Sequence, residues 1–243
     1  MHCQYGALIA ILLGLFVLQA CDQEPAPKPP VQERSEVRFF NALDEPPVNV
    51  RFRTYGETRF LTDRLMPYTS WPEGGYVSLL TRFNDTDTTS LVDNVFFDIV
   101  HYLEDTLLID GYREVLPKGS LASFYLVDSL GKLIMAKTSD QFDKPTGERA
   151  AYRFINLYPF FNGITLESSV VSDSLDFKFS NGFLGHSGFI NVESGRRTLK
   201  AINNSSQTVI DSLSRVDLKP GAVYVFYVLS RNGFPVLEYE RVN

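Results

Sequence analysis

The sequence predicts an all-β protein built from two consecutive β-sandwiches. Three observations support this fold class: apolar and polar residues alternate in short runs, Gly and Pro separate the runs, and one order of motifs occurs twice. The chain also carries 19 Phe and 12 Tyr in 243 residues. Aromatic and β-branched side chains pack well on a pleated, half-buried surface, and short strands spaced by about 8–12 residues are typical of sandwiches.

Residues 1–20 resemble a lipoprotein signal peptide. Residues 5–17 are all apolar, Gly or Tyr, a stretch too short to cross a bilayer comfortably. The tetrapeptide Leu18-Gln19-Ala20-Cys21 follows, and it resembles the lipobox of bacterial lipoproteins, whose cysteine receives a diacylglyceryl thioether. Gln19 is bulkier than the usual residue at its place, and no Lys or Arg precedes Tyr5. A secretory peptide cleaved elsewhere and a short membrane anchor are the alternatives.

Cys21 is the predicted lipidation site and the link to a membrane. Removal of residues 1–20 also removes Cys3, so the mature chain would contain no disulfide. Residues 21–35 form a Pro-rich spacer, which cannot build a core and should hold the folded part away from the lipid. We therefore expect an outer-membrane lipoprotein of the bacterial cell envelope, and the acidic residues after Cys21 resemble signals for surface export.

The rest of the chain is a diverged tandem repeat. Arg38-Phe39-Phe40-Asn41 matches Arg153-Phe154-Ile155-Asn156. A second set of matches lies later in each copy: Leu116, Gly119, Phe124, Tyr125 and Gly131 correspond to Leu218, Gly221, Phe226, Tyr227 and Gly233. Between these two sets, Tyr68 and Gly74 match Phe189 and Gly195. The boundaries are a first module at 36–137 with an insertion near 82–105, a linker at 138–149 and a second module at 150–243.

Alternation with a period of two places strands in both copies. Residues 48–53 put Val48, Val50 and Phe52 on one face, and residues 175–180 repeat the pattern. Residues 222–229 and 121–127 carry almost no polar residue, so each is predicted to be a central strand covered on both faces. Residues 91–103 could form a helix, but their β-branched and aromatic centre favours a strand.

This order of motifs resembles the bacterial domain of unknown function 4397 family. The likeness lies in a first strand of apolar-Arg-apolar-apolar-Asn type, an aromatic residue and a Gly before a middle strand, and a late Leu-x-x-Gly before an aromatic strand. The segment at 158–161 departs from the family pattern, which has Asp soon after the first Asn. The resemblance implies an extracytoplasmic immunoglobulin-like β-sandwich, often in tandem and lipid-anchored, without an established catalytic set.

The charge and the chemistry-bearing residues point away from several functions. A net charge of −6 argues against a nucleic-acid partner, since that affinity comes from clustered cations. His101 and His186 lie one in each half, which is not the spacing of a zinc site, and no metal or other cofactor is expected. Gly185-His186-Ser187-Gly188 differs from a nucleophile elbow in the place of its second Gly. We expect no enzyme activity, and an envelope hydrolase would need a compact carboxylate or Ser/His pair.

Aromatic residues give the weak candidates for a ligand site. Tyr158, Phe160 and Phe161 precede an Asn-Gly turn, and Trp71 lies between Tyr68 and Tyr76. Such rings could form an exposed platform that stacks on sugar C–H faces. The alternative is that they fill the core, where large aromatic side chains are usually found.

These observations predict a non-catalytic, lipid-anchored envelope protein whose two modules serve in adhesion, assembly or structural interaction. The alternative is a carbohydrate-binding accessory lipoprotein of a polysaccharide-capture system. The expected partners are thus the membrane, through Cys21, and an envelope protein or a glycan.

Overall fold

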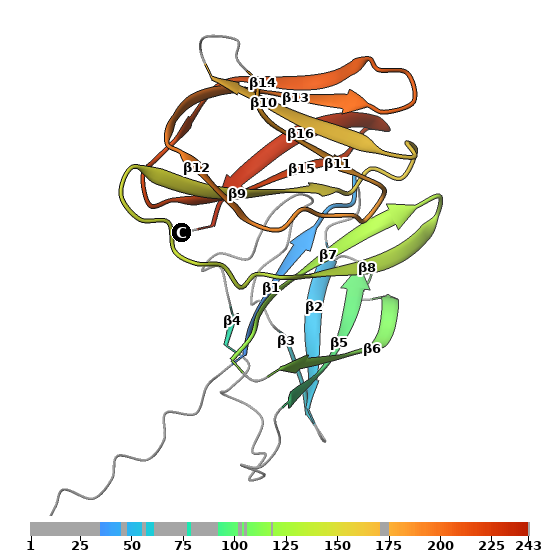
Figure 1. Cartoon of the computed structure of the whole chain (residues 1–243). Helices are drawn as coiled ribbons and strands as arrows, with labels where there is room; N and C mark the ends of the chain where they lie inside the picture. Colours follow the sequence, from blue (N-terminus) through green and yellow to red (C-terminus); the bar gives the residue numbers. More distant parts are fainter. Residues whose placement is uncertain are drawn as a thin grey trace, which may run out of the picture. The chain divides into compact units, whose positions relative to one another are not determined.

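The computed structural model describes residues 35–44, 48–54, 57–60, 77–78, 92–101, 104, 106–117, 119–170 and 175–242 (Figure 1). Throughout these ranges the regular structure is β-strand, as the fold class requires. None of the described residues belongs to a helix long and apolar enough to span a membrane.

In the described residues of the first half, eight strands form two sheets. They are β1 (Glu36–Asn41), β2 (Val48–Thr54), β3 (Glu57–Phe60), β4 (Val77–Ser78), β5 (Val92–His101), β6 (Leu107–Pro117), β7 (Leu121–Ser129) and β8 (Lys132–Ser139). One sheet has the order β4-β1-β7-β8 and the other β3-β2-β5-β6. All neighbours are antiparallel except β1 and β7, which are parallel.

The second half repeats this arrangement strand for strand. Its strands are β9 (Arg149–Asn156), β10 (Ile164–Val170), β11 (Leu175–Asn181), β12 (Ile190–Glu193), β13 (Gly195–Asn203), β14 (Val209–Leu218), β15 (Val223–Arg231) and β16 (Phe234–Arg241). The sheet orders are β12-β9-β15-β16 and β11-β10-β13-β14, and β9 is parallel to β15. The chain is therefore a tandem of immunoglobulin-like β-sandwiches.

The residues that match in the sequence also pair equivalently. Phe39 lies opposite Phe124 in the first half, and Phe154 lies opposite Phe226 in the second. The last residue of each repeated motif forms the same turn, because Asn41 Oδ1 accepts from Leu43 N at 3.2 Å and Asn156 Oδ1 accepts from Tyr158 N at 3.0 Å. The sequence repeat is thus a structural repeat.

Each half has its own apolar core between its two sheets. In the first core, Phe39 contacts Phe97 with ring centroids 4.6 Å apart and stacks on Phe124 at 5.1 Å. In the second, Tyr152 contacts Phe226 at 5.3 Å and Phe177 at 4.5 Å. The predicted apolar faces of the strands at 48–53 and 175–180 supply residues to these cores: Val48 and Val50 in one, Phe177 and Phe179 in the other.

A third apolar cluster joins the two halves. Its buried members from the first half are Phe40, Ala42, Tyr125 and Val127, and those from the second are Ile155, Leu157, Val225, Tyr227 and Leu229. Phe40 contacts Tyr227 across this cluster with ring centroids 4.8 Å apart. Residues 34–243 accordingly form one compact unit.

Alternation along the central strands explains this double burial. On β7, Phe124 and Leu126 belong to the core of the first half, whereas Tyr125 and Val127 belong to the shared cluster. The strand β15 divides its residues in the same way. The prediction of central strands covered on both faces is therefore confirmed, and the second cover is the other half of the chain.

Two features differ from the expected layout. Residues 92–101 fall within the insertion predicted near 82–105, but they form β5. This strand takes the sheet position that β13 takes in the second half. Between β3 and β5 the first half uses residues 61–91, but the second half uses only 182–194 between β11 and β13. Within the range 138–149, given to the linker, Thr138 and Asp140 are buried.

Candidate functional site

The residues predicted to carry function divide into described and undescribed ones. Cys21, the predicted lipidation site, and Trp71 lie outside the described residues, as do Tyr68 and Tyr76. Tyr158, Phe160 and Phe161 are described and lie in the connection between β9 and β10. Of the two aromatic groups, only the second lies within the described residues.

Tyr158 is a buried residue at the edge of the core of the second half. Its side chain is 5% exposed, and its ring lies 5.2 Å from Phe160 and 4.9 Å from Phe161. The Tyr158 hydroxyl donates to Gly233 O at 3.3 Å, which ties this connection to the turn between β15 and β16. Burial, followed by the negative charge of Asp44, raises the pKa of Tyr158, so the phenol stays protonated.

The three rings have different surroundings. Phe161 is partly buried against the core, and Phe160 is 55% exposed. The core-filling alternative therefore holds for Tyr158 and in part for Phe161. Phe160 alone presents a ring that a ligand could reach, and Tyr158 supports that ring from below the surface.

A carboxylate binds the same turn as Tyr158 does, at Gly233. Asp44 Oδ2 accepts from Ser230 Oγ at 2.9 Å and from Gly233 N at 3.2 Å. The residue after Gly233 is Phe234, whose side chain is 72% exposed. We call Asp44, Tyr158 and Phe160 the Tyr158 site; it combines residues of both halves.

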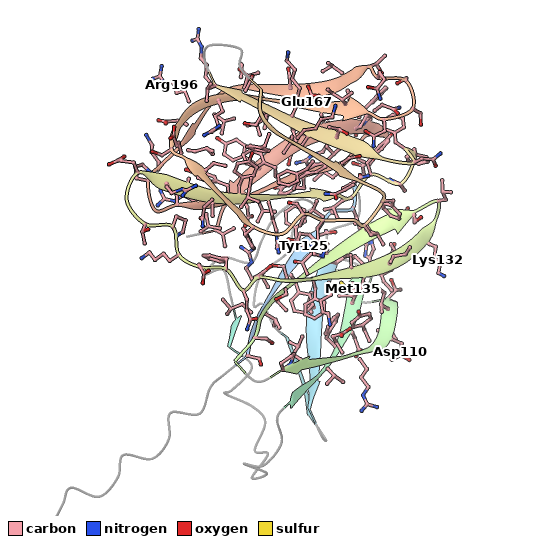
Figure 2. All side chains as sticks on the ribbon, in the orientation of Figure 1. Asp110, Tyr125, Lys132, Met135, Glu167 and Arg196 are labelled. Atoms are coloured by element: carbon pink, nitrogen blue, oxygen red, sulfur yellow. The ribbon has the colours of Figure 1, made fainter. Side chains whose placement is uncertain are left out.

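A second polar group is buried between the halves. The repeated arginines Arg38 and Arg153 are 2% and 1% exposed, and both interact with Asp140, which is fully buried. Arg153 donates to Asp140 Oδ1, to Tyr125 Oη at 3.0 Å and to Ser139 O at 2.9 Å. Arg38 donates to Ser123 Oγ at 3.1 Å, and its Nε lies 3.8 Å from Asp140 Oδ2. Tyr125 is labelled on β7 in Figure 2.

Glu240 on β16 completes this group of charges. We call Arg38, Arg153, Asp140 and Glu240 the Asp140 cluster. Arg38 Nη1 donates to Glu240 Oε1 at 2.9 Å, a contact that joins β1 of the first half to β16 of the second. Burial raises the pKa of Glu240 to about 7, Arg38 opposes that shift, and Asp140 adds to it. The two arginines thus share the Asp140 carboxylate and the carboxyl group of Glu240 in a region withdrawn from water.

The contacts of the Asp140 cluster are those of a structural ion network. Buried charges are costly unless they are paired and hydrogen-bonded, and here each guanidinium reaches across to the shared carboxylate. Arg153 also lies over the ring of Phe189, with its guanidinium carbon 4.6 Å from the ring centroid. The cluster therefore fixes how the two halves pack.

The described residues contain no group of three or more His, Cys, Asp or Glu placed to hold a metal ion. The two histidines have separate local partners. His101 Nδ1 accepts from Glu104 N at 3.2 Å, and His186 Nδ1 lies 3.1 Å from Ser187 O.

Sequence reasoning missed most of these polar residues. In the sequence Arg38 and Arg153 mark the repeat, and a single arginine inside each of two matching apolar runs is also a sign of a buried, paired charge. No local pattern singles out Asp44, Asp140 or Glu240, because their partners lie far away in the sequence.

Comparisons with known proteins add little to this geometry. No family model and no curated protein sequence matches the chain. Among solved structures, a candidate cell adhesion protein from Bacteroides ovatus is similar at 9% identity and a TM-score of 0.26, over 87% of this chain and 97% of that one. The family CBM26 module CBMbc from Eubacterium rectale Amy13K, solved with maltoheptaose, is similar at 12% identity and a TM-score of 0.25, over 86% and 95%.

The Bacillus anthracis TIE protein is similar at 6% identity and a TM-score of 0.26, over 82% of this chain. This chain spans about a third of that protein, 34% of its length. Similarities at this level carry no argument about the function of the present chain.

Proposed function

We propose that this chain is a non-catalytic, lipid-anchored protein of the bacterial cell envelope, whose two sandwiches serve in adhesion, assembly or structural interaction. The observation that carries the proposal is that the buried charges pair with one another. Arg38, Arg153 and Asp140 hold two repeated sandwiches together instead of lining a reaction site. The two sandwiches therefore form one compact unit.

The sequence before this body supports the anchoring part of the proposal. Cys21 stands where the apolar stretch and the lipobox-like tetrapeptide end, and a Pro-rich spacer follows it. Two or three acyl chains on one cysteine would hold the protein durably at a membrane, since each buried methylene contributes about 0.8 kcal/mol. The spacer would let the two sandwiches act at a distance from the lipid.

The proposal also groups each half with the domain of unknown function 4397 family. What supports this is that the motif residues of the resemblance occupy equivalent places: Arg38 and Arg153 both reach Asp140, and Asn41 and Asn156 form the same turn. The arginine and the asparagine therefore have structural reasons to recur.

Fractionation of cells expressing the full chain tests the anchoring. We expect the wild type and a Cys3→Ser variant in the outer-membrane fraction, and a Cys21→Ser variant released or retained with its signal peptide. Protease treatment of intact cells then separates a surface-facing protein from a periplasmic one. Equal membrane association and equal processing of wild type and Cys21→Ser would overturn the proposal.

Glycan binding is a second candidate function, favoured by one observation. Phe160 is exposed, whereas Tyr158 is buried and hydrogen-bonded. The Phe160 ring therefore packs against a side chain that is held in place.

A further inference from the structure

One tripeptide occurs four times in the chain. It consists of Asp, then Ser or Thr, then Leu, and its copies are residues 105–107, 128–130, 173–175 and 211–213. In the second half, the hairpin place that corresponds to 128–130 is taken by Ser230-Arg231-Asn232. The duplication of the sandwich therefore does not account for the copy at 128–130.

The copies lie in different local structures. Residues 128–130 end β7 and enter the β7–β8 turn, just before Lys132, which is labelled in Figure 2. Residues 211–213 lie inside β14, and Thr106 directly precedes β6. Ser174 lies outside the described residues. A turn, the interior of a strand and the start of a strand share no backbone requirement, so the fold itself does not explain the recurrence of these three residues.

The hydroxyl groups of the described copies are accessible. Thr106 and Ser212 are exposed, and Ser129 is partly exposed. Among the described residues, no hydrogen bond involves any of these three hydroxyl groups. By contrast, the hydroxyl groups of Ser206 and Thr208, which are also exposed, bind each other at 2.7 Å. An unbound hydroxyl oxygen can act as a nucleophile when an enzyme supplies the base.

Leu130 is the residue of the tripeptides that the fold explains least. It has a left-handed backbone with φ of 57° and is 77% exposed. Asn232 has the equivalent place in the other hairpin, and asparagine tolerates this conformation better than leucine does. A residue that breaks a local rule without a gain in packing indicates a functional reason for its presence. Here that reason is an enzyme that reads the tripeptide.

We propose that the Ser or Thr of this tripeptide is a site of O-glycosylation; the four sites are Thr106, Ser129, Ser174 and Ser212. The hydroxyl oxygen attacks the anomeric carbon of a glycosyl diphosphate. The bond between that carbon and the diphosphate oxygen breaks, the diphosphate leaves, and the hydroxyl proton passes to a base of the transferase. The order of carboxylate, hydroxyl and apolar residue also resembles an O-glycosylation signal of some envelope proteins. This modification goes beyond the proposed function and does not depend on the lipid at Cys21.

The charges beside the hydroxyl groups favour a glycan over a phosphate. Asp128 Oδ1 accepts from Gly131 N at 2.6 Å, and Asp211 Oδ1 accepts from Ser212 N at 2.7 Å, so both carboxylates are fixed close to their serine. A phosphate would add a charge of about −1.5 to −2 beside each carboxylate. The chain already carries a net charge of −6. A neutral glycan adds no charge, and its bulk would shield the exposed Leu130 from water.

Peptide mass spectrometry of the full chain, purified from the bacterium that naturally makes it, tests the inference. The reference is the same chain made in a host without protein glycosylation. We expect hexose-containing mass additions on the peptides with Ser129 and Ser212. Alkaline β-elimination should remove each addition and leave dehydroalanine at that position. Ser129→Ala should lose the addition at its own position and keep the one at Ser212.

Asp128→Asn separates the tripeptide from the turn. The amide oxygen can still accept from Gly131 N, so the turn is kept, and we expect modification of Ser129 to fall at least tenfold. Ser214→Ala is the matched control, because Ser214 is exposed on β14 two residues after Ser212 but does not follow an Asp. It should leave every addition in place.

Unmodified peptides for both Ser129 and Ser212 would overturn the inference. A phosphate at either serine, or full modification of Ser129 in Asp128→Asn, would overturn it as well. None of these results would change the lipid at Cys21 or the membrane association of the chain. Failure of this inference is therefore distinguishable from failure of the proposed function.

Discussion

Leu130 and Asn232 occupy the same place in two equivalent hairpins, the turns β7–β8 and β15–β16. Both residues have a left-handed backbone, with φ of 57° and 51°, and each is followed by a glycine with positive φ. Asparagine tolerates this conformation well, whereas leucine does so at a cost of about 1–2 kcal/mol. Leu130 is also 77% exposed, so no packing offsets the strain.

Replacing Leu130 by Asn should stabilise the protein. We expect Leu130→Asn to raise the free energy of unfolding by about 1 kcal/mol, because it relieves the strained backbone and removes an exposed apolar side chain. Urea denaturation followed by circular dichroism measures the change. The reciprocal variant Asn232→Leu should lower the value by a similar amount, and a destabilised Leu130→Asn would contradict this explanation.

Replacing Asp140 should change the free energy of unfolding much more than replacing Leu130 does. Its removal leaves the guanidinium groups of Arg38 and Arg153 buried without their shared carboxylate. We expect Asp140→Ala to lower the free energy of unfolding by about 3–5 kcal/mol. The control is Asp217→Ala, which breaks the exposed pair with Lys219 and should leave stability unchanged. Equal effects of the two substitutions would show that Asp140 does not hold the halves together.

At the scale of elements, β1 and β16 meet through Arg38 and Glu240. Burial raises the pKa of Glu240 from 4.5 to about 7, so the folded protein binds this proton more tightly than the unfolded chain does. Folding therefore takes up a proton between these two pH values. The contribution of Glu240 to stability is greatest below about pH 4.5 and is lost as the pH rises through about 7.

Unfolding measured between pH 5 and pH 8 checks this sign. We expect Glu240→Gln to flatten the pH dependence by an amount on the order of 1–3 kcal/mol across that window, because the amide has no proton to lose. Glu238→Gln, on the same strand and paired with Arg231, should keep the slope of the wild type. An unchanged slope in Glu240→Gln would refute the assignment.

The elements could be predicted from the sequence because strands have a local signal. Alternation marked the strands at 48–53 and 175–180, and a run without alternation marked β7 and β15 as central. What covers the second face of β7 could not be predicted. Phe124 faces the core of its own half and Tyr125 faces the other half, but both residues are aromatic, so residue type does not distinguish the two faces. For the candidate site, the sequence indicated Phe160 but not Asp44, which comes near Tyr158 only because both residues bind the distant Gly233.

At the scale of the whole molecule, the two sandwiches share a buried apolar cluster and a buried ionic cluster. The shared cluster uses equivalent residues from both copies, such as Tyr125 and Tyr227. Interfaces between domains are often small and allow relative motion, but a large apolar one does not. The two halves should therefore unfold together.

Hydrogen exchange in increasing urea tests this coupling. We expect amides of β10 and β13 in the second half to lose protection at the same urea concentration as amides of β7 in the first. Phe40→Ala, which truncates a ring in the shared cluster, should lower that midpoint in both halves, at a cost of about 3–5 kcal/mol. Phe234→Ala removes an exposed ring and should shift neither. Loss of protection in the first half alone would show that the two sandwiches unfold independently.

The proposal that a lipid holds this tandem of sandwiches at a membrane can be tested directly. Mass spectrometry of the protein extracted from bacterial membranes would read the mature N-terminus. We expect a chain that begins at Cys21, with residues 1–20 removed and a diacylglyceryl thioether on the cysteine sulfur. A chain cleaved at another residue, or one whose Cys21 carries a free thiol, would contradict it.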